Sequence, residues 1–289
     1  MTEIPFCKFH GFGNDYIVIE RDKIPASIAL PDLALGICHR HTGVGSDGIA
    51  VLEKITDGDA DYFCEIVNPD GSIAGFSGNG TRCAVAYLYY KSLWRDTALR
   101  LETRSGVKNY TLIERMAEGH YWFEAEIGKP KFRASEIPVA GDVGESVVNR
   151  EIEVDDRQFL FSGVNVGNPV ACVFVDDFNL DWRWYGRVME THPMFPERAN
   201  IVFVRVISKD EIELRIWERG AGETSASGTC SSGAAVLSAF TGKTGRRVSV
   251  LSAGGRTEVD WRSDDEILLT GRADIAFRGE WPIAVGGKQ

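Results

Sequence analysis

The sequence predicts an α+β protein of two similar domains, each a β-sheet rolled around a central helix. Three observations support this fold class. Short runs of branched and aromatic residues recur along the chain, each half contains one long apolar helical pattern, and both patterns begin with similar residues. A chain of 289 residues is also long enough for two domains.

The predicted strands are apolar runs bounded by Gly, Asp or Asn, residues that favour tight turns. In the first half they cover residues 16–19, 48–52, 62–67 and 121–123. In the second half they cover residues 170–175, 201–206, 211–217 and 248–251. This recurrence of short strands in both halves indicates a sheet in each.

Two apolar helical patterns, over residues 79–93 and 229–240, are predicted to be the central helices. The first contains Ala84, Val85 and Leu88, and the second contains Ala234 and Leu237. A third helix, over residues 181–191, is predicted to be amphipathic. Each half therefore has one helix apolar enough to lie inside its sheet.

The two central helices begin alike, with Ser77-Gly78-Asn79-Gly80 before the first and Ser227-Gly228-Thr229 before the second. The two serines lie about half the chain apart, which indicates an internal repeat. Two ordinary serine N-caps would produce the same local pattern. The polar residues that flank both starts favour a functional interpretation over capping alone.

Composition excludes several classes of function. The net charge of −10 argues against a broad nucleic-acid surface, because phosphate binding needs clustered Lys and Arg. No run of about 18 apolar residues predicts a membrane span, and the N-terminus lacks the pattern of a signal peptide. The six cysteines form no CxxC pair, which favours reduced thiols in the cytoplasm.

A helix N-terminus offers unpaired N–H groups with partial positive charge, so two such starts facing each other would hold a small carboxylate. Arg219 and Glu218 could then bind a second carboxylate and an ammonium group. The pattern predicts an amino-acid ligand. The predicted binding residues are Gly78, Asn79, Gly228 and Thr229 through their backbone, and Asn14, Asn68, Asn168, Asn200, Glu218 and Arg219.

Six segments, in order, carry a family resemblance: GFGND (11–15), NPDGS (68–72), SGNGTRC (77–83), GNP (167–169), HPMFP (192–196) and ERGAGET (218–224). Each segment alone is a weak pattern, but six in order along most of the chain are specific. On these residues the chain resembles the diaminopimelate epimerase family.

The resemblance implies a ligand cleft between two α/β domains, residues 1–133 with 274–289 and residues 134–273. It implies interconversion of LL- and meso-diaminopimelate in lysine biosynthesis by two-base proton transfer, without pyridoxal phosphate, metal or other cofactor. It further implies a cytoplasmic isomerase that forms a homodimer and whose partner is a small amino-acid substrate, not a nucleic acid or a membrane.

In that family one cysteine thiolate removes the α-hydrogen while an opposing thiol delivers a proton to the other face. The matching positions here are Ser77 and Ser227, which are the predicted catalytic residues. Val170 also stands where the family commonly has a histidine. Because a serine hydroxyl is far less acidic than a thiol, it needs a neighbouring base before it can accept a proton.

Three interpretations of the serines stay open at this point. The chain could be a Cys-to-Ser variant of an epimerase. It could be a paralogue with one-base isomerase or dehydratase chemistry on another amino acid. It could also be a catalytically silent protein that binds an amino acid.

Other features are interpreted as structural. Residues 43–48 fit GxGxxG but precede a predicted strand, whereas a dinucleotide fingerprint opens a helix. His39 and His41 have no third ligand nearby in the sequence, so we expect no zinc site. Cys230 is expected to be a small buried residue, and Glu223 is an alternative acid or base.

Overall fold

The computed structural model describes residues 2–141, 146–155 and 157–283, which form two compact units. Unit 1 comprises the chain up to Ala125 and from Gly271 onward, and unit 2 comprises Glu126–Thr270. The divisions expected from the sequence lie eight residues further on, at 133/134, and three residues further on, at 273/274. Residues 284–289 of the expected first domain lie outside the described residues.

Unit 1 contains two α-helices, α1 (Leu30–Ile37) and α2 (Gly78–Tyr90), and a 3₁₀ turn, η1 (Arg21–Lys23). Its strands are β1 (Thr2–Gly11), β2 (Asn14–Glu20), β3 (Ile49–Lys54), β4 (Tyr62–Val67), β5 (Ile73–Ala74), β6 (Ala98–Thr103), β7 (Gly106–Ala117) and most of β8 (His120–Gly128).

Unit 2 contains α3 (Trp182–Glu190), α4 (Gly228–Phe240) and the 3₁₀ turn η2 (Ala134–Glu136). Its strands are β9 (Arg150–Val154), β10 (Arg157–Asn165), β11 (Pro169–Phe174), β12 (Asn200–Val206), β13 (Glu211–Glu218), β14 (Gly222–Thr224), β15 (Arg247–Ser252), β16 (Gly255–Trp261) and the start of β17 (Ile267–Ile283). The remainder of β17 pairs antiparallel with β1 in unit 1.

The two units share one topology. In unit 1, β2 runs parallel to β3, β3 antiparallel to β4, and β4 parallel to β6. In unit 2, β11 runs parallel to β12, β12 antiparallel to β13, and β13 parallel to β15. The short strands β5 and β14 pair with β4 and β13 immediately before α2 and α4. The repeat predicted from the helix entrances thus extends through the whole fold.

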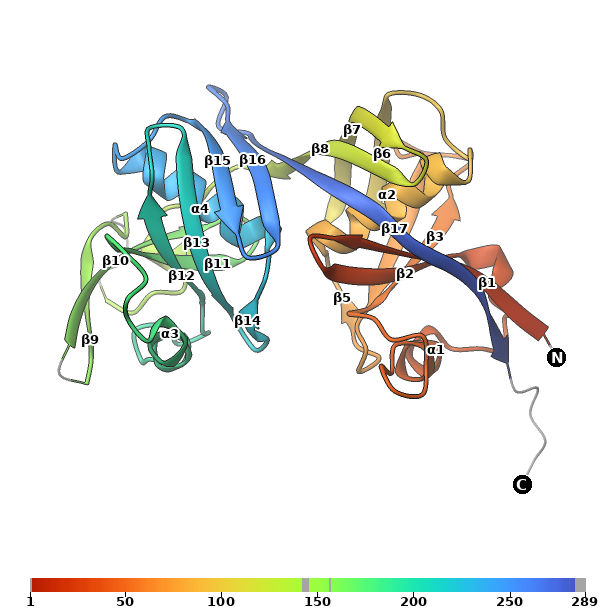
Figure 1. The fold of residues 1–289 in the computed structure, drawn as a ribbon, viewed down its shortest axis with the longest axis horizontal. Coiled ribbons are helices and arrows are strands. Elements are labelled where there is room, and N and C mark those ends of the chain that lie inside the picture. Colours follow the sequence, from red (N-terminus) through yellow and green to blue (C-terminus); the bar gives the residue numbers. More distant parts are fainter. Residues whose placement is uncertain (1, 142–145, 156, 284–289) are drawn as a thin grey trace. The chain divides into compact units, whose positions relative to one another are not determined.

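Each sheet is rolled around its own central helix, as predicted (Figure 1). Nearly every residue of α2 from Asn79 to Tyr89 is buried, and α4 is buried from Cys230 to Ser238. The core of unit 1 gathers around α2 residues such as Leu88 and that of unit 2 around α4 residues such as Leu237. The α+β fold class is therefore confirmed.

The second helix of each unit covers an outer face of the sheet. Helix α1 packs Leu33, Ala34 and Ile37 in a second apolar cluster with residues of β2 and β3. Helix α3 packs Trp182 and Met189 against the outer face of unit 2. The sequence analysis predicted α3 but not α1, because α1 is only eight residues long and begins with Leu-Pro.

Helix α2 ends at Tyr90, three residues before the predicted end. Ser92 has a φ of 55°, and the Leu93 N–H donates to the Leu88 carbonyl at 2.9 Å. This six-to-one hydrogen bond closes the helix as a Schellman cap does. Leu93 therefore packs after the helix end instead of extending it.

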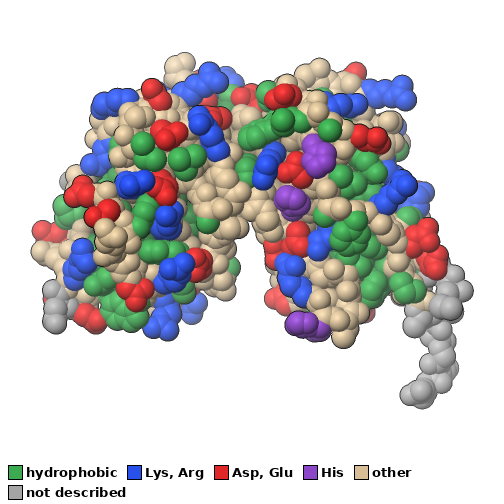
Figure 2. Space-filling model, viewed as in Figure 1, with side chains coloured by type: hydrophobic (Ala, Val, Ile, Leu, Met, Phe, Trp, Pro, Cys, Tyr) green, Lys and Arg blue, Asp and Glu red, His purple; other side chains and the backbone are tan. Residues whose placement is uncertain are grey.

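Charged side chains of both signs are interspersed over the face in Figure 2, with no large basic patch on that face. Among the described residues, no helix is both long and apolar enough to cross a membrane.

We expect Leu88→Ala to lower the free energy of unfolding by about 2–5 kcal/mol, because Leu88 is fully buried and its truncation leaves a cavity beside α2. Urea unfolding measures this loss. The matched control is Leu35→Ala in α1, where the side chain is 53% exposed and the change should be about 0.5 kcal/mol or less. Equal losses in the two variants would contradict the assigned core.

Candidate active site

Ser77 and Ser227 are the N-caps of the two central helices. Both have extended backbone, with φ and ψ of −139° and 118° at Ser77 and −143° and 125° at Ser227. Each Oγ accepts a hydrogen bond from the backbone three residues on, from Gly80 N–H at 3.1 Å and from Cys230 N–H at 3.4 Å. The residues between are the first of each helix, whose N–H groups have no intrahelical partner. Both helix starts can therefore receive an anion.

In unit 2, the hydroxyl of Ser227 donates to a carboxylate oxygen of Glu218. The Ser227 Oγ to Glu218 Oε2 distance is 2.9 Å, and Thr224 Oγ1 donates to Oε1 at 2.7 Å. Glu218 ends β13 and Thr224 ends β14, so the hairpin between them brings both side chains to the helix start. The sequence analysis assigned Glu218 to an ammonium group and did not foresee this pair.

Burial raises the pKa of Glu218 above that of an ordinary glutamate, although the hydrogen bonds from Thr224 and Ser227 oppose the shift. A carboxylate with a raised pKa is a stronger base than an exposed one. Because its Oε2 already accepts the Ser227 proton, Glu218 is placed to activate this hydroxyl. Serine in this position therefore has the neighbouring base that its chemistry needs.

The other predicted residues of unit 2 support this helix start and the turn after β13. Asn168 Nδ2 donates to Thr229 Oγ1 at 3.3 Å, which places Asn168 beside the first turn of α4. Asn200 is buried, and its Oδ1 accepts from the Arg219 N–H at 2.9 Å. The Arg219 guanidinium is exposed and donates to the Glu197 carbonyl at 3.1 Å.

Glu190, at the end of α3, was missed by the sequence analysis. Its carboxylate is buried and accepts from Trp217 Nε1 at 2.9 Å and from the Gly220 N–H at 2.8 Å. These contacts hold both sides of the Glu218–Arg219 turn. The available signal was helical spacing, since Glu190 lies one turn after the buried Gly186 and so on the apolar face of α3.

In unit 1, Ser77 is paired with a phenol instead of a carboxylate. The Tyr16 hydroxyl lies 2.9 Å from Ser77 Oγ, and either oxygen can be the donor. Asn68 lies at the end of β4, where its Nδ2 donates to Ser72 Oγ at 2.9 Å. No sequence pattern singled out Tyr16, which lies inside a predicted strand.

Asn14 and Asn79 belong to one chain of hydrogen bonds with a fixed direction. Arg82 is fully buried and donates to Asn79 Oδ1 at 2.8 Å, Asn79 Nδ2 donates to Asn14 Oδ1 at 3.1 Å, and Asn14 Nδ2 donates to Asp47 Oδ2 at 2.7 Å. Arg40 pairs with Asp47 at 2.7 Å at the end of this chain. The structure thus joins Asn14 and Asn79 next to the start of α2.

Cys83 in α2 and Cys230 in α4 are the cysteines nearest the two helix starts, and both are fully buried. Burial raises the pKa of Cys83 to about 12 and raises that of Cys230 well above its ordinary value. Both thiols are therefore protonated at neutral pH, and Cys230 is a small buried residue, as expected. Glu223, the alternative acid or base, is exposed and forms an ion pair with Arg183 that lowers its pKa.

The Gly-rich segment 43–48 leads directly into β3, so it opens a strand and lacks the helix of a dinucleotide fingerprint. Over the described ranges, the structure contains no group of three or more His, Cys, Asp or Glu side chains that could hold a metal ion.

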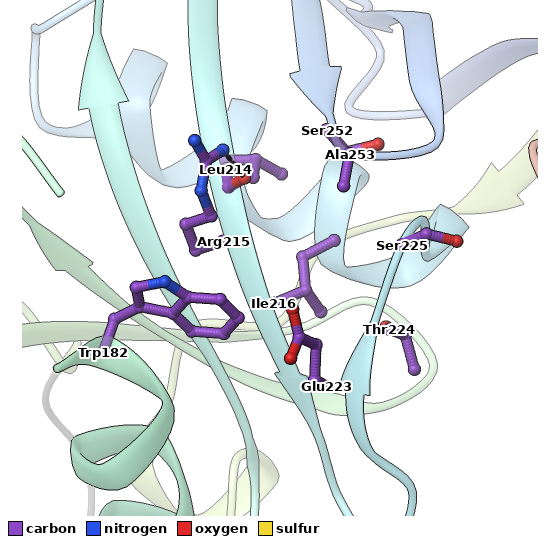
Figure 3. Close-up of a pocket in the computed structure, with 9 residues that line it drawn as sticks. All are labelled: Trp182, Leu214, Arg215, Ile216, Glu223, Thr224, Ser225, Ser252 and Ala253. Carbon is purple, nitrogen blue, oxygen red and sulfur yellow. Dashed lines mark hydrogen bonds between the residues drawn. The ribbon is translucent and has the colours of Figure 1, made fainter.

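A shallow hollow of unit 2 lies beside β13 and β14, with Trp182 and Arg215 on one side and Ser225 and Ala253 on the other (Figure 3). Its lining includes Glu223 and Thr224, but neither of the two serines nor any of the predicted binding residues. We therefore describe each helix start as a candidate half-site in its own unit.

Comparison with known proteins identifies the family of the chain. A family model described as "Diaminopimelate epimerase" matches residues 6–132 and 162–276. The diaminopimelate epimerase of Pelotomaculum thermopropionicum is 37% identical over 281 residues, 96% of this chain and 98% of the relative. That of Moorella thermoacetica is also 37% identical, over 283 residues, 96% of this chain and 99% of the relative.

Solved structures show the same fold at lower identity. A phenazine biosynthesis protein of the PhzF family from Bacillus anthracis has a TM-score of 0.70 at 17% identity, over 98% of this chain and all of that one. A hydroxyproline epimerase from Agrobacterium vitis, solved with bound trans-4-hydroxy-L-proline, has a TM-score of 0.70 at 15% identity, over 97% of this chain and 92% of that one.

The Thr224 hydroxyl stabilises the ionised form of Glu218, so we expect Thr224→Val to raise the pKa of Glu218 further. Carbon-13 NMR titration of the carboxyl groups measures this pKa, with Glu218→Gln identifying the signal. Thr241→Val is the control, because the Thr241 hydroxyl donates only to carbonyl groups near the end of α4. An unchanged or lowered pKa in Thr224→Val would exclude the assigned hydrogen bond.

Proposed function

This chain belongs to the diaminopimelate epimerase family, and on that premise we propose that it inverts the α-carbon of diaminopimelate, or of a similar amino acid, by proton transfer without pyridoxal phosphate. In this proposal Ser227 and Ser77 occupy the two proton-transfer positions. Glu218 is the base that makes Ser227 competent, and the two helix starts hold the carboxylate at the reacting carbon.

One observation carries the proposal: the half-buried Glu218 carboxylate accepts a hydrogen bond from the Ser227 hydroxyl at 2.9 Å. An α-hydrogen beside a carboxylate is only weakly acidic, so its removal needs a strong base and stabilisation of the carbanion. Ser227 passes its proton to Glu218 as its oxygen takes the proton from the α-carbon. The raised pKa of Glu218 favours this transfer.

The helix starts supply the stabilisation. Negative charge spreads from the α-carbon onto the carboxylate as the proton leaves, and backbone N–H groups at a helix N-terminus favour negative charge there. We assign this role to the backbone of Gly78, Asn79, Gly228 and Thr229. The remainder of the amino acid would be held by Asn14, Asn68, Asn168, Asn200, Glu218 and Arg219.

We also propose a cytoplasmic enzyme of lysine biosynthesis that acts on a free amino acid, needs no cofactor and forms a homodimer. All six cysteines are free and buried, which supports a reducing compartment. The net charge of −10 supports a small-molecule substrate over a nucleic acid.

A second candidate function is a one-base isomerase or dehydratase acting on another amino acid. It is favoured by one observation, that only one of the two serines is hydrogen-bonded to a carboxylate, whereas the other has a phenol partner. One-base chemistry removes and returns a proton on a single face, so it gives exchange or elimination without inversion.

Incubation with LL- and meso-diaminopimelate in deuterium oxide, followed by NMR, separates these functions. We expect deuterium incorporation with inversion. Exchange without inversion would favour the one-base reaction, and tight binding without exchange would show a silent amino-acid-binding protein. Ser77→Cys and Ser227→Cys together are expected to raise the exchange rate, because a thiol needs less help to transfer a proton.

Glu218→Gln should lower the rate of exchange at the Ser227 face by about 10²–10⁴-fold, because the amide cannot accept the Ser227 proton. In the unmodified protein the rate should rise with pH as Glu218 ionises, with a midpoint above that of an ordinary glutamate because its pKa is raised. In Glu218→Gln, the exchange rate should no longer rise with pH in this acidic range. Glu223→Gln is the matched control, since Glu223 is an exposed glutamate paired with Arg183, and a comparable loss there would contradict the role of Glu218.

A further inference from the structure

We propose that Tyr16 is the proton donor of the unit 1 half-site and acts on the substrate through Ser77. This inference rests on the proposed function and assigns both pairs for one direction of the inversion: the Glu218–Ser227 pair removes the α-proton and the Tyr16–Ser77 pair delivers the new one. The two pairs exchange these roles in the reverse direction.

The Tyr16 ring reaches Ser77 because two glycines leave room for it. A Cβ at Gly48 would lie 2.8 Å from Tyr16 Cε1, and a Cβ at Gly80 would lie 2.9 Å from the same atom. Both distances are too short for real contacts, so any larger residue would displace the ring. The ring is 6% exposed, and its hydroxyl ends 2.9 Å from Ser77 Oγ at the start of α2.

The two serines differ in where their own proton can point. A serine hydroxyl has one donor and two acceptor positions. Ser77 Oγ accepts from the Gly80 N–H, and when it also accepts from Tyr16 its proton is left for a ligand. Ser227 instead directs its proton to Glu218. Ser77 is therefore set to give a proton and Ser227 to take one.

The strand registers show that the same two strand positions lie near the serine in each unit, so either position can supply a hydrogen-bond partner for that serine. Ala74 and Thr224 lie three residues before the two serines and are opposite Ile66 and Ile216, respectively. Asn68, two residues after Ile66, therefore corresponds to Glu218. The place that holds a carboxylate in unit 2 holds a neutral amide in unit 1.

The same registers continue to the second place. Val67 is opposite Ile49, which is parallel to Ile17. In unit 2, Trp217 is opposite Ile201, which is parallel to Ala171. The preceding residues, Tyr16 and Val170, therefore correspond. Val170 is apolar and packs against Gly233 of α4, whereas Tyr16 brings a hydroxyl to the helix start, so each half-site has one ionisable partner, in different places.

The proton balance of the step is complete. As the new C–H bond forms at the α-carbon, the Ser77 O–H bond breaks, and the Tyr16 O–H bond breaks to restore it. A phenolate remains at Tyr16 and a carboxylic acid at Glu218, and solvent returns both to their starting states. The phenol helps because tyrosine, with an ordinary pKa of about 10, is a far stronger acid than a serine hydroxyl.

Tyr16→Phe removes the donor and keeps the ring. We expect inversion to fall by about 10²–10⁴-fold in this variant. One of the two isomers, the one that presents its α-hydrogen to Ser227, should still exchange with retention in deuterium oxide. Tyr89→Phe is the control, because the Tyr89 hydroxyl donates to the Asp96 carbonyl at 2.6 Å, away from Ser77. A rate of inversion in Tyr16→Phe within about threefold of that of the unmodified protein would overturn the role of Tyr16. Loss of exchange from both isomers would overturn it as well.

A rescue separates a proton donor from a packing residue. We expect Ser77→Cys to restore inversion in the Tyr16→Phe background, since a thiol delivers a proton without a phenol. Failure of this rescue in a folded double variant would overturn the proposal. If Ser77→Cys with Ser227→Cys is inactive in an unmodified background, the failure belongs to the proposed function.

The Tyr16–Ser77 pair is also tested without turnover. In an ultraviolet titration of the phenols, Ser77→Ala should shift the midpoint of one tyrosine, and this shift should be absent when Tyr16→Phe is added. An identical titration of Ser77→Ala and unmodified protein would show that the pair does not form and would overturn the proposal whatever the activity.

Discussion

The structure depends on one constraint, the burial of a whole helix inside a rolled sheet. Such a helix can reach solvent or ligand only at its ends, and its first N–H groups need partners. The serine N-caps, Ser77 and Ser227, satisfy one N–H each and leave the neighbouring groups to an anion. Glu218, the last residue of β13, contacts the Ser227 cap directly. The proposed ligand would therefore bind at the same few atoms that cap the helix.

The same constraint explains how one scaffold supports two chemically different half-sites. A strand that ends beside the cap contributes one side chain to it, as β13 does with Glu218. A strand that lies along the helix can contribute a second side chain where small residues leave room for it. Strand β2 does so with Tyr16, whose ring lies against Gly48 and Gly80. In the proposed site, each of these two residues sets the proton chemistry of one half-site. The identity of these partners is decisive for the proposed chemistry, because a serine hydroxyl needs a neighbouring base before it can accept a proton.

Much of the scaffold followed from local signals in the sequence. The runs at 62–67, 201–206 and 211–217 became strands within one residue of their predicted bounds, because branched residues bounded by turns have few alternatives. Helix α1 and the exposed strand β7 escaped prediction, because α1 is short and β7 lacks a buried face over most of its length. The alternation of apolar and polar residues is weak in a segment that has no buried face, so such a segment is hard to predict from the sequence.

The candidate site also has one part that local sequence predicts and one part that it does not. The sequence alone determined that Ser77 and Ser227 begin two equivalent buried helices, since capping and helical periodicity are local properties of the chain. Only the tertiary structure decided which side chains contact those serines. Glu218, Tyr16 and Glu190 reach their partners across strand pairings and helix packing, and hydrogen bonds between residues far apart in the chain leave no period or spacing in the sequence.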